Sequence, residues 1–184
     1  ANVGAAGSID LFKLFNENVI SGESNPVELS RALIKFPISE ITSMDSQKQI
    51  DINNSSFRCH VKMHDIYGGQ TTPSNFTLIL FPLAKSFNEG SGMDVVKYSD
   101  LGNSNFITAS IVNSVAQEWA TSGARSSGSL GSDGIDVIVS GTLAGPSGTS
   151  VVSLSPTQHF EKGTEDLSID VTRIVSGTIS GQIP

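Results

Sequence analysis

Residues 57–64 alternate strictly between apolar and polar side chains, and this pattern constrains the fold more than any other in the chain. The apolar positions are Phe57, Cys59, Val61 and Met63, and the polar positions are Arg58, His60, Lys62 and His64. A period of two is typical of a strand with one buried face. We therefore expect the apolar set to be buried and the polar set to face solvent or a partner. A slip of one residue would expose the whole apolar set, so burial fixes the register.

Other short apolar runs indicate further strands, and turn-forming residues separate them. The strand candidates are residues 9–15, 76–81, 135–139, 151–154 and 167–171. The run 76–81 is apolar on both faces, which predicts a central strand. Only 16% of the residues are charged and 18 are glycine. Many short strands with frequent turns predict an all-β antiparallel sandwich or jelly roll with long loops, at most one or two short helices, and a single domain over residues 1–184.

Residues 25–36 fit two local structures. Asn25 at an N-cap, Pro26 at the first helical position and Glu28 at the third would begin a helix. A strand would instead place alternate apolar residues from Ala32 onward on one face. Periodicity alone does not decide between them. Residues 39–54 and 123–134 are polar and linker-like, and we interpret the second as a surface loop.

Charge and cysteine content exclude several classes of partner and site. The net charge is −7 and the isoelectric point is about 4.8, so nucleic acid and anionic membranes would repel the surface. Cys59 is the only cysteine, so no disulfide forms within the chain, which favours assembly in a reducing cytoplasm. No apolar run has the length of a membrane span or signal peptide. The sequence begins at Ala1, and we expect it to be part of a larger polypeptide or assembly.

The histidines do not form a motif typical of a metal or hydrolytic site. A strand places Cys59 and His60 on opposite faces, and it separates His60 from His64 by roughly 13 Å at ~3.4 Å per residue. One tetrahedral ion cannot bind both imidazoles. His159 lies in no distinctive motif, and no Gly-x-Ser-x-Gly follows an apolar strand. We therefore predict no metal site, cofactor or catalytic triad.

Four acidic residues could supply a pair of carboxylates for glycoside hydrolysis. They are Glu89, Asp94, Glu165 and Asp166. Glu89 and Asp94 could also bind calcium with loop carbonyls, although no Asp-x-Asp-x-Asp run supports this. Acidic residues in turns more often accept backbone N–H groups or stay solvated. We therefore expect no catalytic residue, and we expect Glu89 to accept hydrogen bonds within its turn.

Three segments share a distinctive order and spacing, namely LSRALIKF at 29–36, SFNEGSGMD at 86–94 and EDLSIDVTRIV at 165–175. Together they resemble the landmarks of the DNRLRE-type β-sandwich domain, in the variant found in structural proteins of tailed bacteriophages. The resemblance implies a strand from about Arg31 and allows a short helix at 172–176. Such domains continue past the equivalent of residues 180–184 into another strand. The resemblance therefore implies either that the polypeptide extends further or that another subunit supplies this strand.

Trp119 is the only candidate ligand-binding residue. An exposed tryptophan can stack on a sugar ring. Its segment, EWATSGA at 118–124, resembles a family segment in which the tryptophan covers the end of the sandwich. The resemblance therefore implies that Trp119 packs.

The resemblance implies a non-enzymatic structural or interaction module of a phage virion, on the capsid or tail. Such a subunit would be assembled in the host cytoplasm, with other virion subunits as partners in an oligomeric assembly. The alternative is a carbohydrate-binding module of an adhesin or a polysaccharide-degrading enzyme, with a glycan as the ligand.

Overall fold

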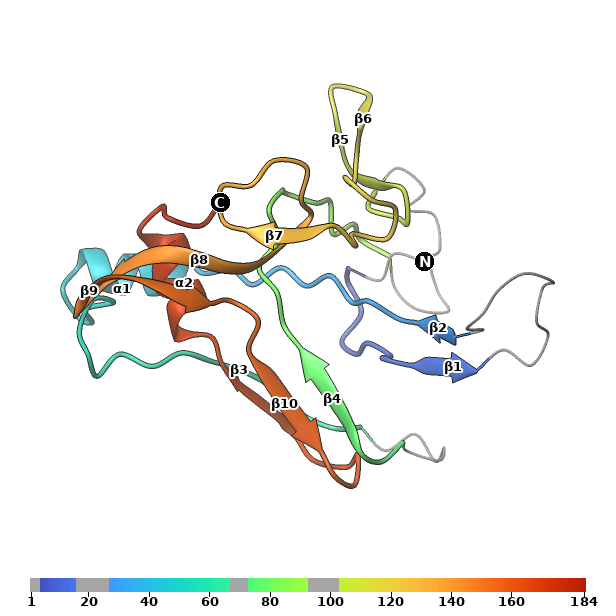
Figure 1. The fold of residues 1–184 in the computed structure, drawn as a ribbon, viewed down its shortest axis with the longest axis horizontal. Helices are drawn as coiled ribbons and strands as arrows, with labels where there is room; N and C mark the ends of the chain where they lie inside the picture. Colours follow the sequence, from blue (N-terminus) through green and yellow to red (C-terminus); the bar gives the residue numbers. More distant parts are fainter. Residues whose placement is uncertain (1–3, 16–26, 67–72, 93–102) are drawn as a thin grey trace. The chain divides into compact units, whose positions relative to one another are not determined.

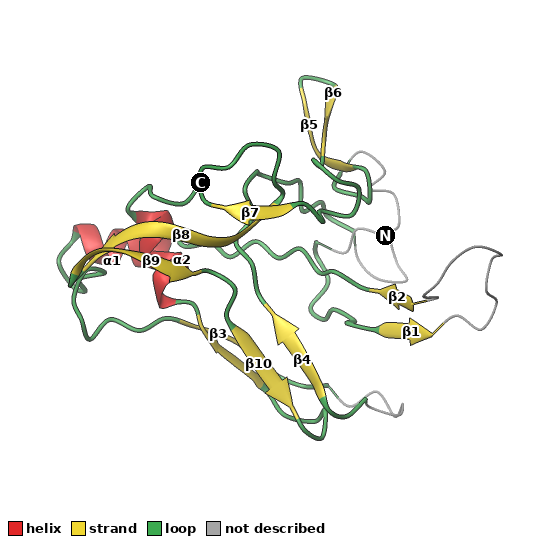
Figure 2. Cartoon of the chain, in the orientation of Figure 1, coloured by secondary structure: helices red, strands yellow, loops and turns green. Residues whose placement is uncertain are grey.

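The computed structural model describes residues 4–15, 27–66, 73–92 and 103–184 (Figure 1). It consists of short strands in several small sheets with two short helices (Figure 2). All strand pairs but one are antiparallel. This confirms the predicted all-β, sandwich-like fold. None of the helices in these ranges is long and apolar enough to cross a membrane.

The chain divides into two compact units. The first unit is Ala1–Phe36 with Ser86–Gly123, and the second is Pro37–Lys85 with Ala124–Pro184. In the first unit, β1 (Lys13–Phe15) pairs with β2 (Val27–Leu29), and β5 (Thr108–Val112) pairs with β6 (Val115–Glu118) as a hairpin.

The second unit contains two antiparallel strand pairs that share one apolar core. β3 (His60–Met63) pairs with β11 (Leu167–Asp170), and β4 (Phe76–Ile79) pairs with β10 (Thr157–Phe160). The fully buried members of the core are Phe160, Leu167, Ile169 and Val171. Phe76 stacks on Phe160 across the second pair, with ring centroids 4.8 Å apart.

The side chain of Gln158 joins the two pairs. Its Nε2 donates to the carbonyl of Asp166 at 2.9 Å, and its Oε1 accepts from the backbone N–H of Ser168 at 2.7 Å. The side-chain amide therefore makes hydrogen bonds that a neighbouring strand would otherwise make with the backbone at this edge of β11. It ties β10 to β11 where no backbone ladder does so.

The rest of the second unit is a three-stranded sheet with two helices. β8 (Val137–Gly145) lies between β7 (Ser127–Ser129), which is parallel to it, and β9 (Gly148–Ser153), which is antiparallel. The helices are α1 (Ser39–Ser46) and α2 (Thr172–Ile179). A second core cluster contains Ile138, Leu143, Leu154 and Ile183. The residues after α2 thus pack beside β8, where Gln182 Oε1 accepts the N–H of Ala144 at 2.6 Å.

The alternation predicted for residues 57–64 is confirmed. Every apolar residue of this segment is half-buried, and every polar residue is exposed. β11 alternates in the same way, with Leu167 and Ile169 buried and the residues between them exposed. The helix expected at 172–176 is present as the first part of α2.

Three local predictions are wrong. β4 is not a central strand, because Ile79 is 49% exposed and β4 pairs only with β10 among the described residues. No strand begins at Arg31, and the N–H of Lys35 is bonded to the carboxylate of Glu89 at 3.2 Å instead of to a strand. The helix alternative fails as well, because β2 occupies Val27–Leu29.

The two linker-like stretches both contain regular structure. Residues 39–54 include α1, which buries no side chain and so has no apolar stripe that the sequence could reveal. Residues 123–134 include β7, which pairs with β8 although its sequence is only Ser-Gly-Ser.

Candidate functional site

Trp119 is buried at the end of β6. The residue is only 5% exposed, its Nε1 donates to the carbonyl of Asn105 at 2.9 Å, and its N–H donates to the carbonyl of Ile107 at 2.9 Å. The expectation that Trp119 packs is confirmed. A ring in this position offers no open face to a sugar, so the one candidate ligand-binding residue is part of the interior of the first unit.

The β5–β6 hairpin that precedes Trp119 is shaped by its turn and by a side chain at its base. Its turn is the two-residue loop Asn113-Ser114, and both residues have positive φ (50° and 64°), which suits the twist of a hairpin. At the base, Asn105 Oδ1 accepts the N–H groups of Ile107 and Thr108, both at 2.9 Å. Local side-chain chemistry therefore determines where this hairpin begins and where it turns.

The surface of this hairpin is apolar and uncharged. We call residues 106–117 the apolar hairpin. Its exposed large apolar residues are Phe106, Ile107, Ile111, Val112 and Val115, of which Phe106 is 65% and Val115 is 60% exposed. Val112 and Val115 lie directly opposite each other across the two strands. Every residue from 111 to 118 is exposed, so neither face of this part of the hairpin is covered.

Two of the acidic residues considered for glycoside hydrolysis, Glu165 and Asp166, accept hydrogen bonds from backbone N–H groups. Glu165 Oε1 accepts the N–H groups of Glu161 and Lys162 at 3.1 and 2.9 Å. These bonds, led by that from Lys162, lower the pKa of Glu165. Asp166 Oδ1 accepts the N–H of Asp65 at 3.0 Å. The two carboxylates therefore stabilise the turn between β10 and β11 and its contact with the end of β3.

Glu89, a third carboxylate of that set, belongs to the first unit. Glu89 Oε1 accepts the N–H of Lys35 at 3.2 Å, from a residue 54 positions away in the sequence. Asp94 lies outside the described residues, so neither its proposed pairing with Glu89 nor a calcium site there is described.

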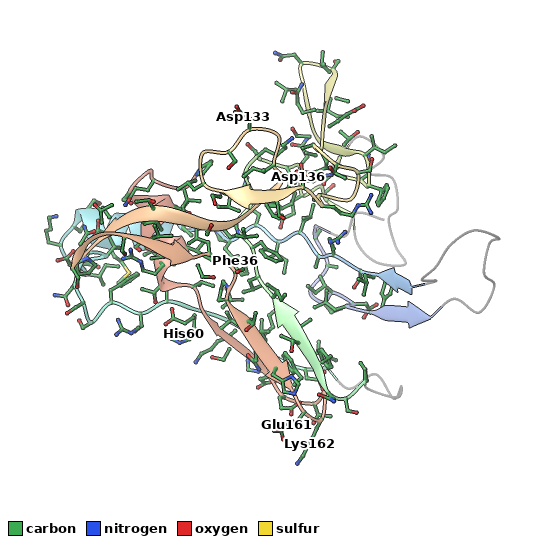
Figure 3. The ribbon with its side chains drawn as sticks, viewed as in Figure 1. Phe36, His60, Asp133, Asp136, Glu161 and Lys162 are labelled. Atoms are coloured by element: carbon green, nitrogen blue, oxygen red, sulfur yellow. The ribbon has the colours of Figure 1, made fainter. Side chains whose placement is uncertain are left out.

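Two exposed histidines, one in β3 and one directly after it, lie beside a carboxylate in β11 and one directly before it. His60 is opposite Asp170 in the register (Figure 3 labels His60), and His64 Nδ1 lies 3.0 Å from Asp166 Oδ2. The pKa of Asp166 is lowered, first by the hydrogen bond from Asp65 N–H and then by His64. His159, on β10, lies 3.2 Å from Thr77 Oγ1. Among the described residues, no three His, Cys, Asp or Glu side chains are grouped so that they could hold a metal ion.

Asp136 is a buried carboxylate that the sequence analysis did not single out (Figure 3). Its Oδ2 accepts the N–H of Ser126 at 3.1 Å, and its Oδ1 lies 3.7 Å from Lys85 Nζ. Ser126 Oγ in turn donates to the carbonyl of Gly134 at 2.7 Å. The carboxylate thus closes the loop that precedes β8. One sequence signal could have identified it, because Asp136 is an acidic residue within an otherwise apolar run.

A hollow of about 340 Å³ lies at the start of α2 in the second unit. Its lining residues are Arg58, Ser153, Pro156, Asp170, Val171, Thr172, Arg173 and Ile174. Asp170 accepts the N–H of Thr172 at 2.8 Å, and Arg58 donates to the carbonyls of Ser55 and Phe57. Asp170 and Arg58 are therefore both hydrogen-bonded to backbone groups around the hollow.

Comparisons of this chain with protein-family models, curated proteins and solved structures found no match. The resemblance to the DNRLRE-type domain therefore stays a prediction from the three quoted segments.

Proposed function

We propose that this chain is a non-enzymatic structural subunit of a phage virion, on the capsid or tail, that acts through protein–protein contacts. The observation that carries the proposal is the apolar hairpin. It exposes five large apolar side chains within ten residues, and exposed apolar side chains gathered in this way are typical of protein interaction sites.

The chemistry of the polar groups also favours a structural role. The carboxylates of Glu165, Asp166 and Asp136 each accept backbone N–H groups of the chain itself. Groups held in this way stabilise turns and loops. A general acid or base would instead have to be directed at a substrate within hydrogen-bond reach.

The carbohydrate-binding alternative depended on an open tryptophan. Trp119 is buried, and its Nε1–H is bonded to a backbone carbonyl. The alternative therefore loses the residue on which it rested, and we do not favour it.

The proposal is tested on particles of the phage whose genome encodes the chain. Peptide mass spectrometry of gradient-purified particles should find the chain at a constant ratio to the other virion proteins. In parallel, the purified chain should fail to bind a glycan array. Absence from intact particles, together with specific retention on a glycan, would reverse the assignment and favour the carbohydrate-binding alternative.

A further inference from the structure

We propose that the apolar hairpin is the surface through which two copies of this chain associate, by packing hairpin against hairpin. The inference rests on the proposed function and deepens it by naming the surface and the partner. Val112 and Val115 would lie at the centre of the contact, because they form a cross-strand pair of exposed apolar side chains on one face.

The first argument is the stability of the hairpin itself. A two-stranded hairpin is at best marginally stable in water unless a further strand or another layer covers an apolar face. Among the described residues, β5 and β6 pair only with each other, and residues 111–118 are exposed throughout. A second copy packed on this hairpin would supply such a covering layer.

The second argument is charge, and it selects the occupant. The chain has 18 acidic and 11 basic residues, so two copies repel one another at most points of approach. Residues 103–117 contain no charged residue at all, so two copies can meet there without bringing like charges together. A basic partner would gain from acidic side chains and finds none on this surface. A second copy therefore suits this neutral surface better than a basic partner does.

The third argument is symmetry. Contact of a surface with itself produces a closed two-fold dimer, the commonest arrangement among oligomeric proteins. The Val112–Val115 pair presents the same apolar chemistry from both sides of such a contact. A hairpin is also small beside a standard interface of about 1,600 Å², so the association should be reversible.

The test is sedimentation velocity of the purified chain between about 1 and 200 μM, a range chosen for a small, weak interface. The wild-type chain should shift from monomer to dimer as its concentration rises. Val112→Lys should weaken the dimer by at least about tenfold, because a charge replaces a buried methyl pair. The matched control is Val151→Lys on β9, since Val151 is 78% exposed and lies outside the hairpin. This variant should dimerise like the wild type.

Salt and folding provide the remaining controls. Added salt should strengthen the wild-type dimer, because it screens repulsion between two acidic copies that meet at a neutral surface. Trp119 lies in the same unit, so its fluorescence shows whether Val112→Lys remains folded. If it does not, Val112→Thr keeps the branched shape and should still weaken the dimer.

Three results would overturn the inference. They are a wild-type chain that stays monomeric over the whole range, an equal loss of association in Val151→Lys, or a dimer that salt weakens. A monomeric chain that is nevertheless found in purified particles would leave the proposed function intact and indicate another virion subunit as the occupant. A dimer that is absent from particles would refute the proposed function alone.

Discussion

Replacing Gln158 tests how the two strand pairs of the second unit are held together. Its side-chain amide donates to the carbonyl of Asp166 and accepts from the N–H of Ser168. Gln158→Ala removes both bonds and leaves two backbone groups of the edge of β11 without these partners. Water can reach part of this edge, because Gln158 is half-buried.

The expected loss follows from the two bonds. Each hydrogen bond contributes about 0.5–1.5 kcal/mol net, so Gln158→Ala should lower the free energy of unfolding by about 1–3 kcal/mol. Gln158→Glu is the matched variant, because it keeps an oxygen that accepts from Ser168 and loses the donor to Asp166. Its loss should lie between that of the wild type and that of the alanine variant.

The assay has to separate the two units. Trp119 is the only tryptophan and lies in the first unit, so its fluorescence during urea unfolding follows that unit. Far-UV circular dichroism follows both. The Gln158 variants should shift the dichroism transition and leave the fluorescence transition in place, and the amide proton of Ser168 should exchange faster in Gln158→Ala. An unchanged exchange rate at Ser168, with stability within about 0.5 kcal/mol of wild type, would refute the role given to this amide.

Three further predictions concern single side chains. Trp119→Phe should destabilise the first unit by about 1–3 kcal/mol through lost packing and a lost Nε1–H bond, as measured by thermal unfolding followed by circular dichroism; a variant as stable as the wild type would contradict the packing described. Burial raises the pKa of Cys59, so a bulky thiol reagent should label it slowly in the native protein and quickly in urea; rapid stoichiometric labelling of native protein would refute the register of β3. Asp166 has a pKa lowered from 3.8 by Asp65 N–H and then by His64, so its contribution to stability is present above that pH and is lost as pH falls through the lowered value. Asp166→Asn should therefore flatten the acid limb of the stability curve, and an unchanged limb would count against this hydrogen bond.

Some parts of the fold follow from contacts between near neighbours in the sequence, and these could be predicted. The alternation of residues 57–64 identified β3 and its buried face, because successive side chains of a strand point to opposite sides. The apolar run at 167–171 likewise identified the strand that became β11. Excluding a metal site that joins His60 to His64 required only the spacing of residues along a strand.

Other parts depend on residues far apart in the sequence. The carboxylate of Glu89 bonds the N–H of Lys35, and the amide of Gln158 bonds the backbone on both sides of Leu167. The spacing of apolar residues in the sequence does not predict such hydrogen bonds. A polar side chain can bond any backbone group that packing brings within about 3 Å. For this reason, the sequence did not reveal that residues 31–36 would lack a strand.

Burial of an individual side chain is also a property of the tertiary structure. Trp119 and Phe106 are both aromatic residues of the first unit, yet Trp119 is buried and Phe106 is exposed. Composition and local pattern treat them alike. The indole of Trp119 also donates its N–H to the carbonyl of Asn105, which precedes β5. The fold of the first unit thus decides that Trp119 is buried and that Phe106 is exposed.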